Sequence, residues 1–332
     1  MLFQEWPLCH IRSVYLTIFE WLFVTIESVI LLLLFYSDPY SYRPKGINVL
    51  KWRFIRNYQT VPYTSRTRFI PVPISDDRIF GERAFEEDKQ NIENFGEILP
   101  STHPYTIRVT NILNQIIHAL HTERNKMSSA SSEYAVWLHL TRSLPPSMSH
   151  LDGLNWEVLV VDKTDIYYTH CYPCGKIVVT TASVEDYTDA HLATVFAHEV
   201  AHIVARHCIE IHTRSYWVYF IDDMLNLFVT IDFAERVHPL IPRLPFNRWL
   251  EMEADYIGIL LMAAAGYDPR CAPIVYEKCE ELEESNNKFT LAGFLRTHPP
   301  GRKRAQALAR PKIMEEALIL YNDVRAKRGD ES

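Results

Sequence analysis

The 332-residue sequence predicts an α+β fold that is mainly helical, with a small β-sheet and an N-terminal hydrophobic helix ahead of it. Residues 194–209 contain no Gly or Pro and repeat apolar residues at helical spacing. Residues 156–161 and 176–181 are rich in β-forming residues and are typical of short strands. Residues 17–36 form an apolar run of about 30 Å as a helix, enough to cross a bilayer.

The helix at residues 194–209 carries the strongest chemical signal, His198-Glu199-Val200-Ala201-His202. Residues four apart lie on one helix face, so His198 and His202 can bind one zinc ion, and Glu199 can take a proton from a metal-bound water. The alternative is a chance motif on an ordinary polar surface. The apolar flanking residues argue against it, because unsatisfied polar groups are costly on a buried helix.

A second helix is predicted from Glu251 through the apolar run of residues 256–265, ending at Gly266. Glu251 and Asp255 share a face, whereas Glu253 is expected to point away. Glu251 would complete a site of two histidines and one carboxylate, with the fourth position open for water. Asp255 would accept a hydrogen bond from a ligand histidine. The alternative for this pair alone is a solvated helix face.

Together these motifs resemble the membrane-associated gluzincin metallopeptidases that include HtpX and the CAAX prenyl proteases. Within that family, the sequence is most similar to the mitochondrial inner-membrane proteases whose activity overlaps that of the m-AAA protease. The resemblance covers roughly residues 57–310. The supporting strings are VPYT-x-RT at 61–67, GEILP at 96–100, WEV at 156–158, GKIVV at 175–179, LPF at 244–246 and THPP at 297–300 with Arg304.

The resemblance implies a zincin-type domain in which His198, His202 and Glu251 bind one Zn²⁺ per chain, with Glu199 as the base. It implies that Asp255 supports the ligands, and that His298 lies near the site and helps to stabilise the reacting carbonyl; a turn-capping role before Pro299 is the alternative. Arg304 and Arg248 would either bridge the carboxylates of the site or be surface charges.

One stretch departs from the family pattern. The family usually has Asn-Ala-Phe followed by Pro-Gly-Gly-Lys in the strand that lines the cleft and pairs with the substrate. Tyr168, Thr169 and His170 replace the first three residues here, and Cys174 replaces a Gly that would tolerate a positive φ. These changes put the shape of the cleft in doubt, but not the metal ligands.

The expected function is that of a zinc metalloendopeptidase acting on membrane-associated or misfolded proteins in organelle membrane quality control. Substrates are expected to bind as an added strand along the edge of residues 176–180. The alternative, motivated by the altered strand, is a proteolytically inactive zinc-binding scaffold at the membrane. A soluble zinc aminopeptidase is a third, weaker interpretation. Expected partners are protein substrates and membrane lipid, with a homo-oligomer left open. The net charge of −7 argues against nucleic acid.

The N-terminal residues leave the topology open. Residues 17–36 contain Glu20 and Glu27 on one stripe, so an interfacial or core helix is the alternative to a membrane anchor. The basic residues that follow place the catalytic domain on the matrix or cytosolic side, whereas the resemblance implies the intermembrane space. A mitochondrial inner-membrane location rests on the resemblance, because residues 1–14 lack an Arg-rich presequence pattern.

The remaining sequence gives a domain division and further elements. We expect an N-terminal segment at 1–40, an approach segment at 41–100 and a metallopeptidase domain at 101–326. Within the last, helices are expected at 105–120 and 313–325, a loop at 122–153, and a buried or interfacial helix in preference to a second span at 216–233. The six cysteines are too scattered for a disulfide scaffold.

Overall fold

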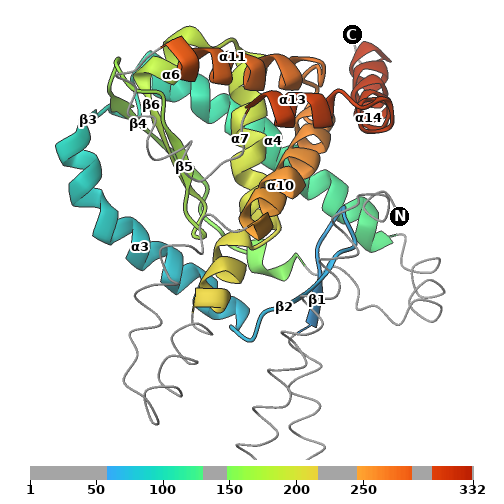
Figure 1. Cartoon of the computed structure of the whole chain (residues 1–332), viewed down its shortest axis with the longest axis horizontal. Coiled ribbons are helices and arrows are strands. Elements are labelled where there is room, and N and C mark those ends of the chain that lie inside the picture. Colours follow the sequence, from blue (N-terminus) through green and yellow to red (C-terminus); the bar gives the residue numbers. More distant parts are fainter. Residues whose placement is uncertain (1–57, 130–147, 216–244, 286–300, 331–332) are drawn as a thin grey trace, which may run out of the picture. The chain divides into compact units, whose positions relative to one another are not determined.

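The computed structural model describes residues 58–129, 148–215, 245–285 and 301–330. These residues form a mainly helical α+β fold with small sheets, which confirms the coarse fold class (Figure 1). The predicted hydrophobic helix at 17–36 and the apolar run at 216–233 lie outside the described residues. Within the described ranges, no helix combines the length and apolar character needed to cross a bilayer.

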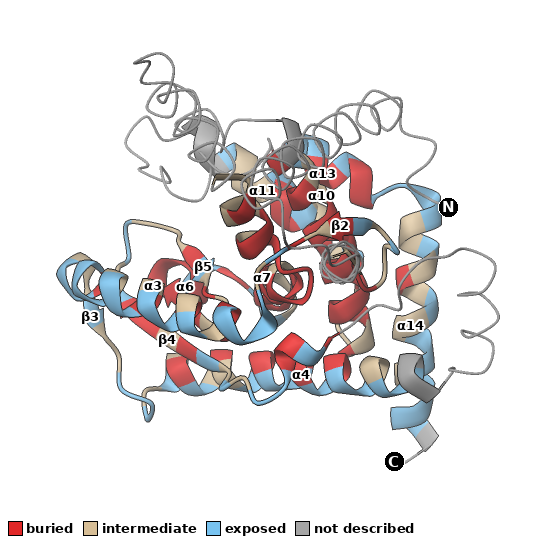
Figure 2. Ribbon diagram, turned by 90° about the horizontal axis from the view of Figure 1, so that it is seen from below, coloured by how far each residue is buried: buried red, intermediate tan, exposed pale blue. Residues whose placement is uncertain are grey.

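Two helices make up the centre of the fold. α7 (Asp189–Val204) and α10 (Pro245–Ala264) pack against each other, and α4 (Pro104–Ser129) packs against both. α7 is apolar on most sides and is therefore buried, as Figure 2 shows. The side chain of Thr188 caps its first turn by accepting a hydrogen bond from the backbone N–H of His191 at 3.3 Å.

α10 ends at the predicted glycine. Gly266 has a φ of 88°, in the left-handed region that glycine adopts without steric cost. The backbone N–H of Tyr267 donates to the carbonyl oxygen of Met262 at 3.0 Å, which satisfies one of the last carbonyls of the helix.

The helix predicted at 194–209 is interrupted, which corrects that prediction. α7 ends at Val204, Arg206 has a φ of 48°, and helical turns resume over residues 207–215. The Arg206 guanidinium binds both carboxylate oxygens of the buried Asp77 at 2.5 Å and Gln59 at 2.8 Å. This buried pair holds Arg206 in a backbone conformation that a continuous helix would not allow.

The four-stranded sheet has the order β3-β4-β6-β5. β4 (Glu157–Asp162) and β6 (Lys176–Thr180) are parallel, β3 (Glu97–Ile98) is antiparallel to β4, and β5 (Thr169–Cys171) is antiparallel to β6. The two predicted strands are confirmed, but the prediction that residues 176–180 form an open edge is wrong. β5 pairs with that side, so β5 is the edge strand, and it packs against α7.

The other elements surround this centre. The predicted helices at 105–120 and 313–325 lie within α4 and α14, and α4 runs through residues 122–129, where a loop was predicted. All described residues belong to one compact unit, and the predicted domain boundary at residue 100 stays a prediction. The remaining elements are β1 (Tyr58–Thr60), β2 (Thr67–Phe69), α3 (Ile74–Phe95), η1 (Ser149–Leu151), α6 (Thr181–Asp186), α11 (Cys271–Ser285), α13 (Gly301–Leu308) and α14 (Pro311–Asp330).

The close contact between α7 and α10 depends on Gly258. A Cβ at this position would lie 3.0 Å from the backbone nitrogen of His198 and 3.1 Å from its Cα. We therefore expect Gly258→Val to lower the free energy of unfolding by about 1–3 kcal/mol through overpacking, measured by urea denaturation.

Gly329→Val is the matched control, since no atom lies within 4 Å of a Cβ added there. Val and Gly differ by less than about 0.5 kcal/mol in helix propensity, so this control should be nearly neutral. Equal stability of the two variants would show that the helix contact tolerates a side chain.

Candidate metal centre

Three groups suited to binding a metal meet between α7 and α10. The Nε2 atoms of His198 and His202 lie 3.0 Å apart, and the Glu251 carboxylate lies 3.4 Å from the first and 3.5 Å from the second. The three donor atoms all lie within 4.8 Å of one another. His198 and Glu251 are buried, while His202 is partly exposed.

This donor set fits a zinc ion. Two imidazole nitrogens and one carboxylate oxygen are the ligands of catalytic zinc sites that keep a fourth position open. The three groups are brought together by the packing of two helices, and the partial exposure of His202 leaves the site accessible from one side.

His198, the first predicted ligand, is held by a buried ion pair. His198 Nδ1 lies 3.0 Å from Asp255, whose carboxylate accepts hydrogen bonds from Arg304 at 2.6 and 2.8 Å. Arg304 is 1% exposed and stacks over the ring of Tyr276 at 3.9 Å. Of the two alternatives considered for Arg304, the structure therefore shows the bridging one, whereas Arg248 is exposed.

The buried ion pair shifts the pKa values of Asp255 and His198. Burial by itself would raise the pKa of Asp255, but the charge and hydrogen bonds of Arg304 outweigh it and hold the pKa well below its usual range. Burial and Arg304 also act to lower the pKa of His198. Its hydrogen bonds to Asp255 and Glu251 reverse that direction and raise the pKa to about 9 in the metal-free protein.

His202, the second predicted ligand, contacts residues to which the sequence analysis gave no role. His207 Nδ1 lies 2.9 Å from His202 Nδ1, and His207 Nε2 lies 3.1 Å from Glu253. Glu253 points away from the ligand atoms as predicted, yet it is fully buried. Burial lowers the pKa of His207 to about 4, so its ring is neutral at physiological pH.

Arg66 completes this second set of contacts. It donates to Glu253 at 2.7–3.1 Å and to Glu210 at 2.7 and 2.8 Å, and the hydroxyl of Thr64 donates to Glu253 at 2.6 Å. The two carboxylates together raise the pKa of Arg66 against the lowering effect of burial. Two features of the sequence could have pointed to Arg66 and His207. One is the string at 61–67, which was noted without a role, and the other is the polar pair Arg206-His207 in an apolar segment.

Glu199 lies on α7 and faces the edge strand. It is 3% exposed, and Cys171 on β5 lies near enough for the two groups to interact electrostatically. Burial raises the pKa of that thiol well above its usual value, and Glu199 raises it further. In the turn after β5, Gly175 is the residue with a positive φ, 91°, so Cys174 does not occupy the conformation that had put its substitution in doubt.

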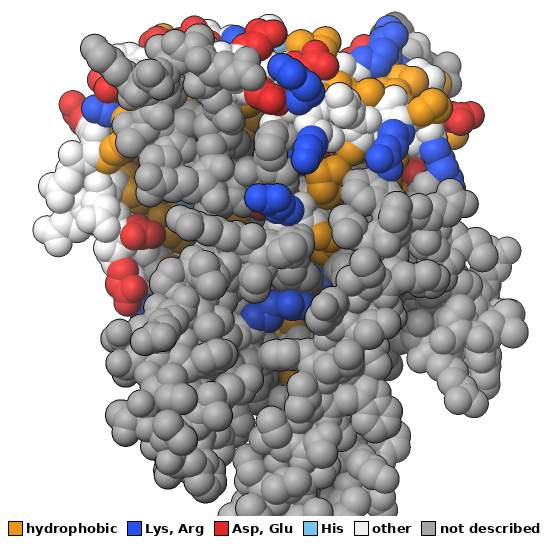
Figure 3. All heavy atoms as spheres, in the orientation of Figure 1, with side chains coloured by type: hydrophobic (Ala, Val, Ile, Leu, Met, Phe, Trp, Pro, Cys, Tyr) orange, Lys and Arg blue, Asp and Glu red, His pale blue; other side chains and the backbone are white. Residues whose placement is uncertain are grey.

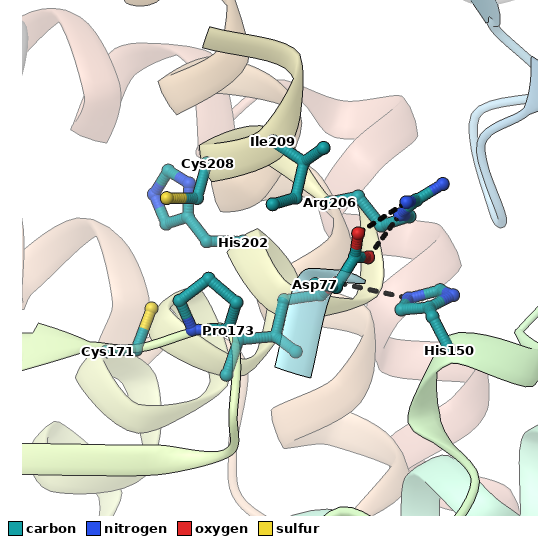
Figure 4. Close-up of a pocket in the computed structure, with 9 residues that line it drawn as sticks. Asp77, His150, Cys171, Pro173, His202, Arg206, Cys208 and Ile209 are labelled. Carbon is teal, nitrogen blue, oxygen red and sulfur yellow. Dashed lines mark hydrogen bonds and ion pairs between the residues drawn. The ribbon is translucent and has the colours of Figure 1, made fainter. Parts of the chain in front are cut away.

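A cavity opens beside His202 (Figure 4). Cys171 reaches it from the edge strand and Pro173 from the turn after that strand, while Cys208 and Ile209 reach it from the helical turns that follow α7. The Asp77–Arg206 pair lies at its far side in the same view. His298, predicted near the site, lies outside the described residues, and its role stays a prediction.

On the face seen in Figure 3, acidic and basic side chains are interspersed along the upper rim. This mixture accompanies the net charge of −7 of the whole chain.

Comparisons with known proteins agree with this donor set. Residues 141–312 match the family described as peptidase family M48. The mitochondrial metalloendopeptidase OMA1 of Arabidopsis thaliana is 38% identical, over 82% of this chain and 65% of its own length. The protein of the same name from Saccharomyces cerevisiae is 28% identical, over 76% and 69%. The mitochondrial metalloendopeptidase OMA1 of Homo sapiens is 28% identical, over 51% and 34%. The chain thus spans about two thirds or less of the length of these relatives.

Removing Arg304 tests how far the site depends on its buried ion pair. We expect Arg304→Met to lower the free energy of unfolding by about 3–5 kcal/mol, because the variant leaves Asp255 buried without its cation. Urea denaturation of the metal-free protein measures this loss.

Arg270→Met is the matched control. Arg270 binds Asp268 with comparable geometry at 2.5 Å, but its side chain is 65% exposed, so its loss should change stability very little. Similar effects of the two substitutions would contradict the assigned dependence of Asp255 on Arg304.

Proposed function

Because the chain belongs to peptidase family M48, we propose that it is a zinc-dependent metalloendopeptidase. His198, His202 and Glu251 would hold one zinc ion per chain. The observation that supports this most directly is the close group of two imidazoles and one carboxylate, with Glu199 on the same helix as both histidines.

Glu199 is proposed as the general base. When bound, zinc supplies a Lewis acid that acidifies a water molecule and polarises the peptide carbonyl. The Glu199 carboxylate would accept the proton of that water and return it to the nitrogen of the leaving amine. The packing of α7 against β5, the strand proposed to pair with the substrate, supports this role. His298 is proposed to stabilise the reacting carbonyl.

The substrate is proposed to bind as a strand added to β5. The backbone N–H of Tyr172 donates to Lys176, and the carbonyl of Tyr168 accepts from Thr180, so these even-numbered residues point their backbone groups at β6. Backbone groups alternate along an antiparallel strand, so those of Thr169 and Cys171 point to the outer edge. An extended peptide can pair with that edge.

The natural substrates are proposed to be membrane-tethered or misfolded proteins in membrane quality control. Two lines support this: the apolar run at 17–36, which would contact membrane lipid, and the word "mitochondrial" in the names of the relatives. We accordingly propose the mitochondrial inner membrane as the location, with homo-oligomerisation left open.

The inactive scaffold is not the favoured alternative. Its motive was the altered sequence of residues 168–174, but residues 169–171 of that stretch form an edge strand in register with β6. The three ligand-type residues lie together, and Glu199 belongs to the same helix as both histidines.

Glu199→Gln separates catalysis from metal binding. The amide cannot accept the proton, whereas the three ligands remain, so we expect one bound zinc ion per chain and cleavage slowed by at least about 100-fold. Metal analysis and an endopeptidase assay on an unfolded protein in reconstituted membranes measure both quantities.

Glu315→Gln, which changes an exposed carboxylate on α14, should leave both zinc content and cleavage unchanged. Full activity of Glu199→Gln would refute the assignment of the base.

Proline at the edge strand tests the proposed mode of substrate binding. Cys171→Pro removes one outward N–H and leaves the pairing of β5 with β6 intact, so kcat/KM should fall by about tenfold, the effect of one lost hydrogen bond, with an unchanged unfolding midpoint. Cys171→Ala keeps the N–H and controls for loss of the thiol.

His170→Pro, by contrast, removes an N–H directed at β6 and should destabilise the fold. If Cys171→Pro cleaves peptides as fast as Cys171→Ala, substrates do not pair with this edge.

A further inference from the structure

The two histidines proposed to bind zinc are oriented in different ways. His198 contacts a carboxylate directly, through Nδ1 and Asp255 at 3.0 Å. His202 reaches its carboxylate through a second imidazole, since its Nδ1 lies 2.9 Å from His207 Nδ1 and His207 Nε2 lies 3.1 Å from Glu253. His207 and Glu253 are 1% and 0% exposed, so water does not substitute for these contacts.

The direction of these hydrogen bonds follows from the ligand role of His202. Its Nε2 faces His198 and Glu251, so in a neutral ring the proton lies on Nδ1 and is donated to His207. His207 Nδ1 must then be the acceptor, and its remaining proton, on Nε2, is donated to the Glu253 carboxylate. Each donor in this series of hydrogen bonds has one acceptor, so the tautomers of both histidine rings are fixed.

We propose that His207 is a positioning residue for the zinc site, fixing the ring orientation and tautomer of His202 through Glu253 and Arg66. The inference rests on the proposed zinc-binding function. It extends the site beyond the two helices that carry the ligands, because Arg66 belongs to the turn between β1 and β2, outside the family match at 141–312.

The turn between β1 and β2 is built to present Arg66. Tyr63 and Ser65 both adopt positive φ values, 66° and 54°, which non-glycine residues rarely do. Between them, Thr64 donates to Glu253 at 2.6 Å, and Arg66 spans Glu253 and Glu210 while lying over the ring of Trp249 at 4.5 Å. A planar guanidinium can bind two carboxylates in this way, and lysine cannot.

Zinc affinity tests the proposal independently of proteolysis. The purified full chain is titrated with zinc against a chromophoric chelator. His207→Leu should weaken zinc binding by about 10–100-fold, the usual effect of losing a residue that orients a ligand. His207→Gln, which can accept from one histidine and donate to the carboxylate, should recover most of that affinity. Arg66→Gln should weaken binding in the same direction but less.

His150→Gln is the matched control. His150 is also buried, and its Nε2 lies 3.1 Å from the carbonyl oxygen of Ile203 on α7, the helix that carries both proposed histidine ligands. Its described hydrogen bond is not to a proposed ligand, so zinc affinity should not change. In cobalt-substituted protein, His207→Leu should also alter the visible absorption bands, whereas His150→Gln should not.

A measurement on the wild type does not depend on the folding of any variant. With ¹⁵N-labelled histidine in the zinc-loaded protein, His207 should appear as the tautomer protonated on Nε2. A His207 protonated on Nδ1, or wild-type affinity in a folded His207→Leu, would overturn the proposal. Failure of the wild type to bind zinc would refute the proposed function instead, so the two failures are distinguishable.

Discussion

Helix α10 buries three carboxylates in little more than one turn, and the site depends on how each one is compensated. Glu251, Glu253 and Asp255 are 7%, 0% and 1% exposed. A buried charge without a partner is too costly to persist, so each carboxylate needs its own cation. Asp255 has Arg304, and Glu253 has Arg66. Glu251 faces the imidazoles of His198 and His202, and the cation that it needs would be the bound zinc ion.

This requirement explains why the site draws on distant parts of the chain. Arg66 comes from the β1–β2 turn and Arg304 from α13, on either side of the ligand helices in the sequence. Buried ion pairs contribute little net stability compared with apolar packing, so their value here is positional. Two-point contacts from each guanidinium fix the carboxylates, and the carboxylates in turn fix the imidazoles.

Local periodicity was enough to predict the helices and the ligand pairs, but not the partners of those ligands. The spacing of His198 and His202 places them on one face, and the structure brings their Nε2 atoms to 3.0 Å. His207 escaped prediction because the helix was expected to continue through Arg206, whereas a long-range contact with Asp77 breaks it there. β5 has only three residues, too few to show a local β pattern, so a cleft-lining strand there followed from the family resemblance alone.

The altered strand affects the cleft less than its sequence suggests, because neighbouring side chains alternate between faces. Tyr168 and Tyr172 pack against Phe95 and Phe85 of α3, at 6.1 and 5.3 Å between ring centroids. The even-numbered substitutions thus rebuild the side of the strand that is turned toward α3. The odd-numbered residues Thr169 and Cys171 are directed to the other face, and Glu199 raises the pKa of the Cys171 thiol. The sequence departures therefore leave the register of the backbone edge that would pair with a substrate unchanged.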